Sequence, residues 1–274
     1  MTQLHAIPIS AGQESAEESF ASGLAGFIRK RQWAWGSVLG GLALWEFISR
    51  VIVGSKLFLA APTQVVIALF ELAWSGEIWK HVWTSGLEFF LGYFLACFLG
   101  VALGFFMASS RAAKEALQPW VSGLYATPTV ALAPLFILWF GIGIFSKVIV
   151  VAVLVIFPVC INTETGLLGT PRQLVETVRS FGATPRQIFF KVSLPFALPF
   201  IFAGLRLGIG RGLIGVVVAE LFGARAGLGQ LISQSAETFN MPNLFAGVTV
   251  LAVAGIAMTS GFMKLERKLI PWRD

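Results

Sequence analysis

The sequence predicts an all-α, polytopic membrane protein with about six transmembrane helices, because its composition and the spacing of its apolar runs both favour a membrane. Of the 274 residues, 56% are hydrophobic and only 12% are charged, and the mean hydropathy is +0.80. A soluble fold of this length would lack the polar side chains needed to cover its surface, so we expect lipid to be its solvent. The apolar residues gather in runs of about 20, the length that crosses the hydrocarbon core of a bilayer.

The first 32 residues are expected to form a cytoplasmic N-terminal tail. They are polar to mildly apolar, and their acidic side chains precede the basic cluster Arg29-Lys30-Arg31. A signal peptide begins with its basic residues and continues with an apolar core and a small-residue cleavage site, an order that is missing here. We therefore expect residues 33–274 to form a single transmembrane domain.

The apolar runs predict six spans. The first contains Glu46 and Arg50, which are four residues apart and can pair on one helix face. Pro62-Thr63, before the second span, opens an amphipathic run that we interpret as a surface helix on the outer side. Pro128 and Pro134 fall inside the third span, which must bend or break. The six predicted spans are 34–53, 84–107, 120–140, 147–168, 197–220 and 244–263.

The basic residues orient these spans, because Lys and Arg accumulate in cytoplasmic loops. With the tail inside and six crossings, the outer segments hold only Lys56, Lys80, Lys147 and Arg225. The cytoplasmic segments hold the remaining basic residues outside the spans: Arg29, Lys30, Arg31, Arg111, Lys114, Arg172, Arg179, Arg186, Lys191, Lys264, Arg267, Lys268 and Arg273. Both termini are therefore predicted to be cytoplasmic, and the net charge of +6 needs no nucleic acid to explain it.

A polar segment between two apolar runs, residues 170–195, is predicted to form a helical hairpin. The sequence Thr-Pro-Arg-Gln occurs at 170–173 and again at 184–187, and each copy supplies a threonine N-cap, a proline at the first helical position and a capping-box glutamine. Gly182 separates the two helices. The apolar face of the first helix comprises Leu174, Val178 and Phe181. This pattern predicts a basic, capped hairpin at the cytoplasmic membrane surface.

The same segment resembles a known signature. Glu176, a six-residue step to Gly182-Ala183 and a closing Leu194-Pro195 resemble the EAA signature of permease subunits in bacterial ATP-driven (ABC) importers. The signature normally reads Glu-Ala-Ala, whereas this chain has Glu176-Thr177-Val178. The similarity extends to both sides of the hairpin and looks like the nitrate, sulfonate and taurine branch. It includes Leu59-Ala60-Ala61-Pro62-Thr63, Pro134-Leu135-Phe136-Ile137-Leu138-Trp139-Phe140-Gly141-Ile142-Gly143 and Gly227-Leu228-Gly229.

The resemblance implies a type I ABC importer permease in the bacterial cytoplasmic (inner) membrane. It implies a non-catalytic chain without a cofactor of its own, with ATP and Mg²⁺ bound by partner ATPase subunits. Further implied partners are a periplasmic or lipid-anchored solute-binding protein, a second permease copy in a homodimer, and membrane lipids. The residues expected to couple the hairpin to the ATPase are Glu176, Arg179, Gly182, Ala183, Thr184, Arg186, Leu194 and Pro195. Without the resemblance, a basic amphipathic hairpin that rests on anionic lipid remains an alternative.

Charged residues in the fifth span are candidates for the translocation path. Arg206 and Arg211 lie inside this span and Glu220 at its end, so each is expected to face protein or water. The alternative is that the arginines pair with Glu220 or with another helix and have a structural role. Pro128 and Pro134 are further path candidates, because a broken helix could shape a gate; the alternative is a helix end anchored at the interface. Positive charge on the path favours a small anionic solute.

Two rival classes can be compared with this interpretation. A secondary carrier or channel for small anions would also be helical, but it has no need of a cytoplasmic hairpin, and ion-driven carriers usually have more intramembrane carboxylates. A membrane-embedded enzyme is disfavoured, because the sequence shows no catalytic or metal-binding constellation. Glycines four residues apart predict close helix packing at Gly36/Gly40, Gly100/Gly104 and Gly204/Gly208/Gly212.

Overall fold

The computed structural model describes residues 33, 35–55 and 57–273. All regular elements in these ranges are helices, in agreement with the predicted fold class. The chain divides into two compact units, residues 1–64 and 65–274. The predicted tail of residues 1–32 lies outside the described residues, and the single domain over 33–274 stays a prediction.

The N-terminal unit contains the first span. Its helix runs over Trp35–Val53, is long and apolar enough to cross a membrane, and ends in a π-helical turn, η1, over Ile48–Val53. The predicted pair is present, with Arg50 Nε 2.5 Å from Glu46 Oε1, and Thr63 Oγ1 donates to the same carboxylate oxygen at 2.8 Å. A Cβ built on Gly36 or Gly40 meets no described atom within 4 Å, and the close packing predicted for this glycine pair stays a prediction.

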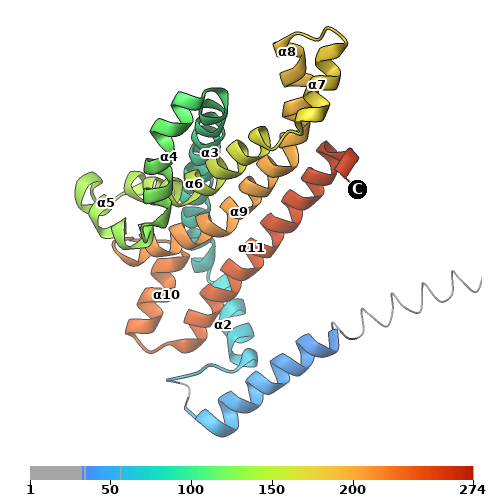
Figure 1. The fold of residues 1–274 in the computed structure, drawn as a ribbon. Helices are drawn as coiled ribbons and strands as arrows, with labels where there is room; N and C mark the ends of the chain where they lie inside the picture. The colour runs from blue at the N-terminus through green and yellow to red at the C-terminus, as the bar shows by residue number, and fades with distance from the viewer. Residues whose placement is uncertain (1–32, 34, 56, 274) are drawn as a thin grey trace, which may run out of the picture. The chain divides into compact units, whose positions relative to one another are not determined.

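A bundle of long helices forms the C-terminal unit (Figure 1). Its central helix is α6, which packs against both α3 and α9. Buried side chains such as Phe89, Val155 and Val216 form the core at these contacts. The three helices are α3 (Glu77–Ser109), α6 (Ile144–Leu168) and α9 (Leu194–Leu221). α3 begins before the predicted residue 84, because its first two turns are helical but too polar for the apolar pattern to include them.

Glycines bring these helices close together. A Cβ built on Gly104 of α3 would lie 2.6 Å from the Thr163 Cβ of α6, and one built on Gly204 of α9 would lie 2.7 Å from the Asn162 Cβ. Real side chains essentially never approach so closely, so glycine is required at both positions. The close packing predicted at Gly100/Gly104 and at Gly204/Gly208/Gly212 is therefore confirmed.

The predicted third span is broken. α4 (Arg111–Ala126) is bent by 84° from the segment Thr129–Phe140, which contains the 3₁₀ helix η2 (Thr129–Leu132) and α5 (Ala133–Phe140). The break falls at Thr127-Pro128, whereas Pro134 lies in the first turn of α5, where proline is tolerated. The prediction of a bend or break is confirmed, at one of the two prolines.

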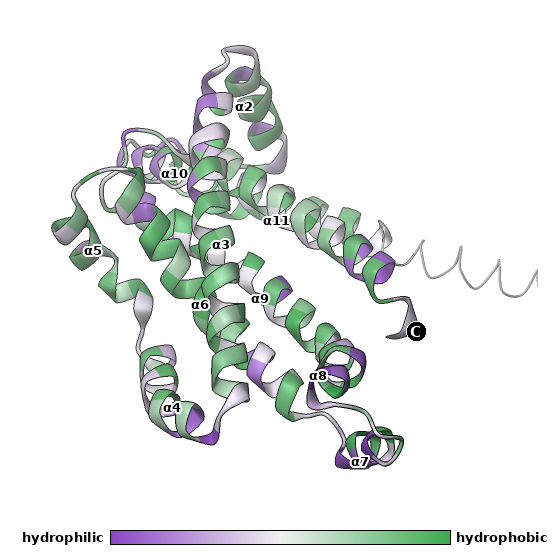
Figure 2. Cartoon of the chain, turned by 90° about the horizontal axis from the view of Figure 1, so that it is seen from above, coloured by the Kyte–Doolittle hydropathy of each residue, from purple (hydrophilic) through white to green (hydrophobic). Residues whose placement is uncertain are grey.

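The remaining helices complete the chain. α2 (Pro62–Trp74) begins at Pro62, the residue at which the predicted surface helix begins. α10 (Leu228–Glu237) and α11 (Met241–Leu269) follow α9, and α11 packs against both of them. The described residues thus contain five helices able to cross a membrane, or six if the bent pair is one span, as predicted. Apolar residues dominate α3, α6 and α9, whereas polar ones gather on α7 (Arg172–Ser180) and α8 (Pro185–Ile188) (Figure 2).

Candidate functional site

The predicted hairpin projects from one end of the helical bundle (Figure 1). α7 and α8 are joined by a turn at Gly182, whose φ of +81° is a conformation that glycine adopts without strain. The capping box at Thr184 is confirmed: the Gln187 N–H donates to Thr184 Oγ1 at 3.3 Å, and the Thr184 N–H donates to Gln187 Oε1 at 2.8 Å. The cap predicted at Thr170 is wrong, because its hydroxyl donates backwards to the Leu167 carbonyl oxygen and α7 begins without a side-chain cap.

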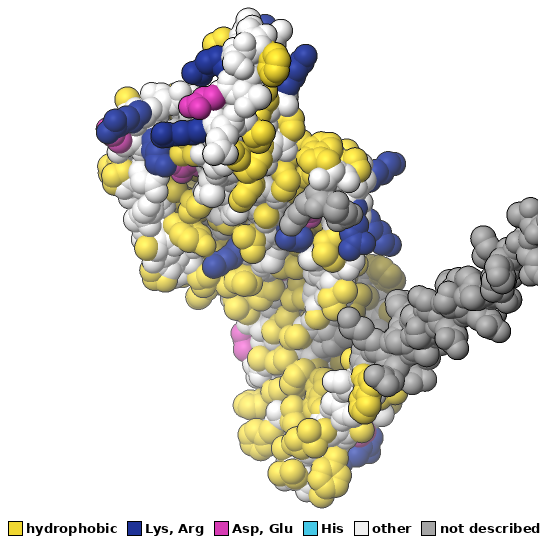
Figure 3. Space-filling view, turned by 45° about the vertical axis from the view of Figure 1, so that its right-hand side comes forward, with side chains coloured by type: hydrophobic (Ala, Val, Ile, Leu, Met, Phe, Trp, Pro, Cys, Tyr) yellow, Lys and Arg dark blue, Asp and Glu magenta, His cyan; other side chains and the backbone are white. Residues whose placement is uncertain are grey.

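The hairpin leaves its apolar face uncovered. No residue of α7 is buried, and Leu174 and Phe181 are 49% and 86% exposed. Arg179 and Arg186 are also exposed, and Lys and Arg side chains are concentrated around this end of the C-terminal unit (Figure 3). The Glu176 carboxylate forms no hydrogen bond or ion pair with any described residue. An amphipathic surface with its apolar stripe in the open is typical of an interface.

The second hairpin helix continues directly into the fifth span. α8, the π-helical turn η3 (Phe189–Ser193) and α9 form a single helical segment over Pro185–Leu221 that is long enough to cross a membrane. Leu194 and Pro195 lie at the start of α9, and Ile201 packs in a core cluster with α6. The sequence analysis treated the hairpin and the span as separate helices, whereas the structure joins them into one continuous helical segment.

Two of the charged path candidates have different surroundings. Arg206 Nη1 lies 3.2 Å from Glu266 Oε2 of α11, which corresponds to the structural alternative of pairing with another helix. Arg211 is exposed and forms no ion pair or hydrogen bond with the described residues. The two arginines therefore do not share one site in this chain. Pro128 is exposed at the break between α4 and α5, and Pro134 is exposed on α5.

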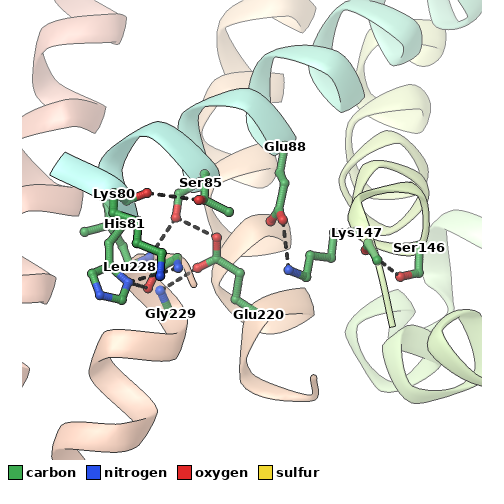
Figure 4. Close-up of polar contacts among 12 residues, drawn as sticks. Lys80, His81, Ser85, Glu88, Ser146, Lys147, Glu220, Leu228 and Gly229 are labelled. Carbon is green, nitrogen blue, oxygen red and sulfur yellow. Dashed lines mark hydrogen bonds and ion pairs between the residues drawn. The ribbon is translucent and has the colours of Figure 1, made fainter. Parts of the chain in front are cut away.

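Glu220, the third charged candidate, belongs to a buried polar network (Figure 4) and lies at the end of α9, whereas the hairpin precedes the start of that helix. Its Oε1 accepts from Ser85 Oγ at 2.6 Å, and its Oε2 accepts from the Gly229 N–H at 2.6 Å. Lys147 Nζ lies 2.8 Å from Glu88 Oε1 in the same region. Among the described residues, Glu220 pairs with neither Arg206 nor Arg211, which was one form of the structural alternative.

The sequence analysis missed this network, although a signal was present. Glu88 is the carboxylate inside the apolar run of α3, and Lys147 begins the apolar run of α6. Both spans cross in the same direction in the six-span topology, so a charge near the start of each lies at one membrane depth. His81 also joins the network, with its Nδ1 3.0 Å from the Gly227 nitrogen and 2.8 Å from the Gly227 oxygen.

The described side chains pack against one another and form hydrogen bonds and ion pairs. They contain no group of three or more His, Cys, Asp or Glu residues that could hold a metal ion. An apolar cavity of about 620 Å³ lies among α3, α9, α10 and α11 and is lined by Trp79, Trp83, Phe89 and Met258, among others. None of the five path candidates lines this cavity.

Comparison with known proteins gives the family. A family model described as "Binding-protein-dependent transport system inner membrane component" matches residues 100–271. The chain is a member of this family. The permease is 37% identical over 234 residues to the putative aliphatic sulfonates transport permease protein SsuC of Bacillus subtilis, covering 85% of this chain and 84% of the relative. It is 35% identical over 232 residues to the formylaminopyrimidine transport permease protein ThiX of Halalkalibacterium halodurans, covering 85% and 92%.

A solved structure supports the fold. A chain of the MetNI methionine ABC transporter matches the permease with a TM-score of 0.60 and 22% identity, over 70% of this chain and 96% of that chain. The permease is thus the non-catalytic, multi-pass inner membrane component of an ABC importer, which works with a separate ATPase and a solute-binding protein. This result excludes the rival classes of secondary carrier, channel and membrane-embedded enzyme.

Proposed function

We propose that the permease imports a small anionic solute and that the hairpin of residues 170–195 couples its transport cycle to the ATPase. The observation that carries the coupling role is the continuous helical segment Pro185–Leu221, which joins the exposed hairpin to the core. The coupling residues are those of the EAA-like pattern: Glu176, Arg179, Gly182, Ala183, Thr184, Arg186, Leu194 and Pro195.

The exposed groups of the hairpin support this contact. Its uncovered apolar stripe loses water when it enters a cleft on a partner, and a Glu176 carboxylate without a partner in this chain is available to accept hydrogen bonds there. A hairpin that served only to rest on lipid would not need to continue as one helical segment into the core. We place the hairpin and both termini on the cytoplasmic side, where basic residues accumulate.

Arg211 supports the anionic solute. Its guanidinium group is exposed in a membrane-spanning helix, where a charged side chain must face protein or water, and no described residue pairs with it. In a homodimer, the exposed face of α9 that carries Arg211 would line a path between the two copies. The SsuC relative is named as a transporter of aliphatic sulfonates, which are anions, and this agrees with a positive group on the path. We assign Arg206, Glu220, Pro128 and Pro134 to supporting positions around this path.

The coupling role is tested by a matched pair of glycine variants. Gly182 and Gly76 both have a φ of +81°, and a Cβ built on either would meet no atom within 4 Å, but Gly76 lies before α3, away from the hairpin. Gly182→Asp is expected to abolish ATP hydrolysis stimulated by the loaded binding protein, whereas Gly76→Asp imposes the same backbone strain without touching the contact. Both are measured on permease–ATPase complexes in lipid nanodiscs, with ATPase co-purification as a second readout. Normal stimulated hydrolysis in Gly182→Asp would remove the hairpin from the coupling path.

A further inference from the structure

Three charged side chains are buried together where the first half of α3, the start of α6 and the end of α9 meet (Figure 4). Glu88 is 1% exposed, Lys147 is 5% exposed and Glu220 is fully buried. Lys147 and Glu88 form an ion pair, and the carboxyl groups of Glu88 and Glu220 point toward each other in the close-up (Figure 4). Two carboxyl groups therefore share a buried region with a single ammonium group.

No other charged side chain in the described part of the chain balances this cluster. His81 approaches from α3, but its Nδ1 contacts the backbone of Gly227. On α10 and the turn before it, the charged residues are Arg225 and Glu237, and both are exposed. α5 has no charged residue, and the first on α11 is Lys264, toward the other end of that helix.

The hydrogen bonds point to a missing donor. Both oxygens of Glu220 accept, one from Ser85 Oγ and one from the Gly229 N–H. Ser85 Oγ also accepts from the Leu228 N–H at 2.7 Å, so its hydroxyl hydrogen is available for Glu220. Glu88 Oε1 accepts from the ammonium group, but Glu88 Oε2 is buried without a hydrogen-bond partner among the described residues. Such an orphaned buried acceptor is costly.

We propose that one proton, taken from bulk water, is bound between these two carboxyl groups, carried by Glu220 and donated to Glu88 Oε2. A protonated carboxyl group supplies the missing O–H donor, and its remaining lone pairs still accept from Ser85 and Gly229. The proton also balances the charge, because Glu88 then pairs with Lys147 while Glu220 is neutral. The same proton thus supplies the missing hydrogen bond to Glu88 Oε2 and removes the unpaired buried charge.

The bound proton holds the turn between α9 and α10 against α3. Gly227 lies so close to Glu220 that a Cβ would overlap the carboxyl group, and Gly229 donates to the same group. When the proton leaves, two facing carboxylates repel each other, and Glu220 moves away from α3 together with the turn. The cluster is therefore a proton-binding site that fastens this turn, and the fastening is lost at alkaline pH.

The glutamine variant Glu88→Gln tests this site because it reproduces the protonated arrangement permanently. Its side-chain oxygen accepts from Lys147, and its amide N–H, at the position of Oε2, donates to an ionised Glu220. Between the pKa of a carboxyl group in the unfolded chain and the pKa of the native site, a native state that holds one extra proton loses about tenfold in its folding constant for each pH unit. Wild type should show this alkaline loss, whereas Glu88→Gln should not. Glu164→Gln, at a buried carboxylate paired with Lys114, is the matched control and should keep the loss.

Unfolding of the full chain in nanodiscs can be followed by labelling of the buried Cys160, with wild type and variants compared at each pH. Infrared difference spectra of wild type against Glu88→Gln should contain the carbonyl band of a protonated carboxylic acid, and this band should disappear at alkaline pH. Parallel pH profiles of the two proteins, or absence of the acid band at neutral pH, would overturn the proposal. An alkaline loss that persists in Glu88→Gln but disappears in His81→Gln would place the proton on the histidine and would also overturn it.

Discussion

Replacing Gly92 of α3 with alanine is expected to destabilise the bundle, although alanine is the better helix former. A Cβ at this position would lie 2.6 Å from the Val151 Cβ and 2.8 Å from the Val148 carbonyl oxygen, whereas ordinary contact begins at 3.4 Å. The first of these distances is 0.8 Å too short, and both obstacles are fixed to the α6 backbone, so α3 and α6 must move apart. Overpacking of this kind costs about 1–3 kcal/mol.

The same helix offers a matched control. A Cβ built on Gly86 of α3 would meet no atom within 4 Å, so Gly86→Ala meets no obstacle and gains helix propensity of about 1 kcal/mol. Because both variants gain the same helix propensity, the difference between them should be the packing cost alone, about 1–3 kcal/mol. Thermal unfolding in nanodiscs, followed by labelling of the buried Cys160, measures it. Equal midpoints for the two variants would show that the contact between α3 and α6 tolerates a methyl group and would refute the reasoning.

Three further variants test individual contacts. Lys147→Met should cost about 3–5 kcal/mol of stability, because it leaves Glu88 buried without its ion partner. The double variant Lys147→Met/Glu88→Leu should recover most of the lost stability. Equal unfolding midpoints for the single and the double variant would contradict the role of the buried charge. Thr184→Ala removes the cap of α8 and should cost about 0.5–2 kcal/mol of local stability, seen as faster hydrogen exchange of the hairpin amides; unchanged exchange would mean that the cap is dispensable. Arg211→Ala should reduce uptake of a sulfonate more than it reduces assembly with the ATPase, whereas an equal loss of both would favour a structural role.

Much of the fold could be predicted because the membrane imposes simple rules. The length of apolar runs gave the spans, and two internal prolines indicated where the third would break. The start of α3 was missed, because its first turns carry Glu77, Lys80 and His81 and lie outside the apolar pattern. The cap at Thr170 was predicted from the same four letters as the one at Thr184. The structure distinguishes the two threonines. α6 continues almost to Thr170, so the Thr170 hydroxyl donates to the Leu167 carbonyl oxygen at the end of that helix.

In the candidate sites too, local features could be predicted from the sequence and long-range contacts could not. The hairpin is a local feature of contiguous residues, so its cap at Thr184 and its exposed apolar face follow from spacing. The network around Glu220 joins residues that are far apart in the sequence, and no local rule states that Ser85 rather than an arginine of α9 will meet that carboxylate. Arg206 was expected either on the path or paired with another helix, and the partner Glu266 lies 60 residues away on α11. Long-range pairing of this kind depends on the register between helices, which the sequence does not display.

The single helical segment Pro185–Leu221 has a mechanical consequence. At 1.5 Å per residue, its 37 residues measure about 55 Å, with the hairpin contact at one end and the network around Glu220 at the other. A tilt of only about 5° about its middle would shift each end by about 2 Å in opposite directions, by the geometry of a rod of that length. A displacement of that size is enough to break a hydrogen bond of 2.6 Å such as those made by Glu220. A movement of the hairpin would therefore reach the turn before α10 through this one continuous helical segment.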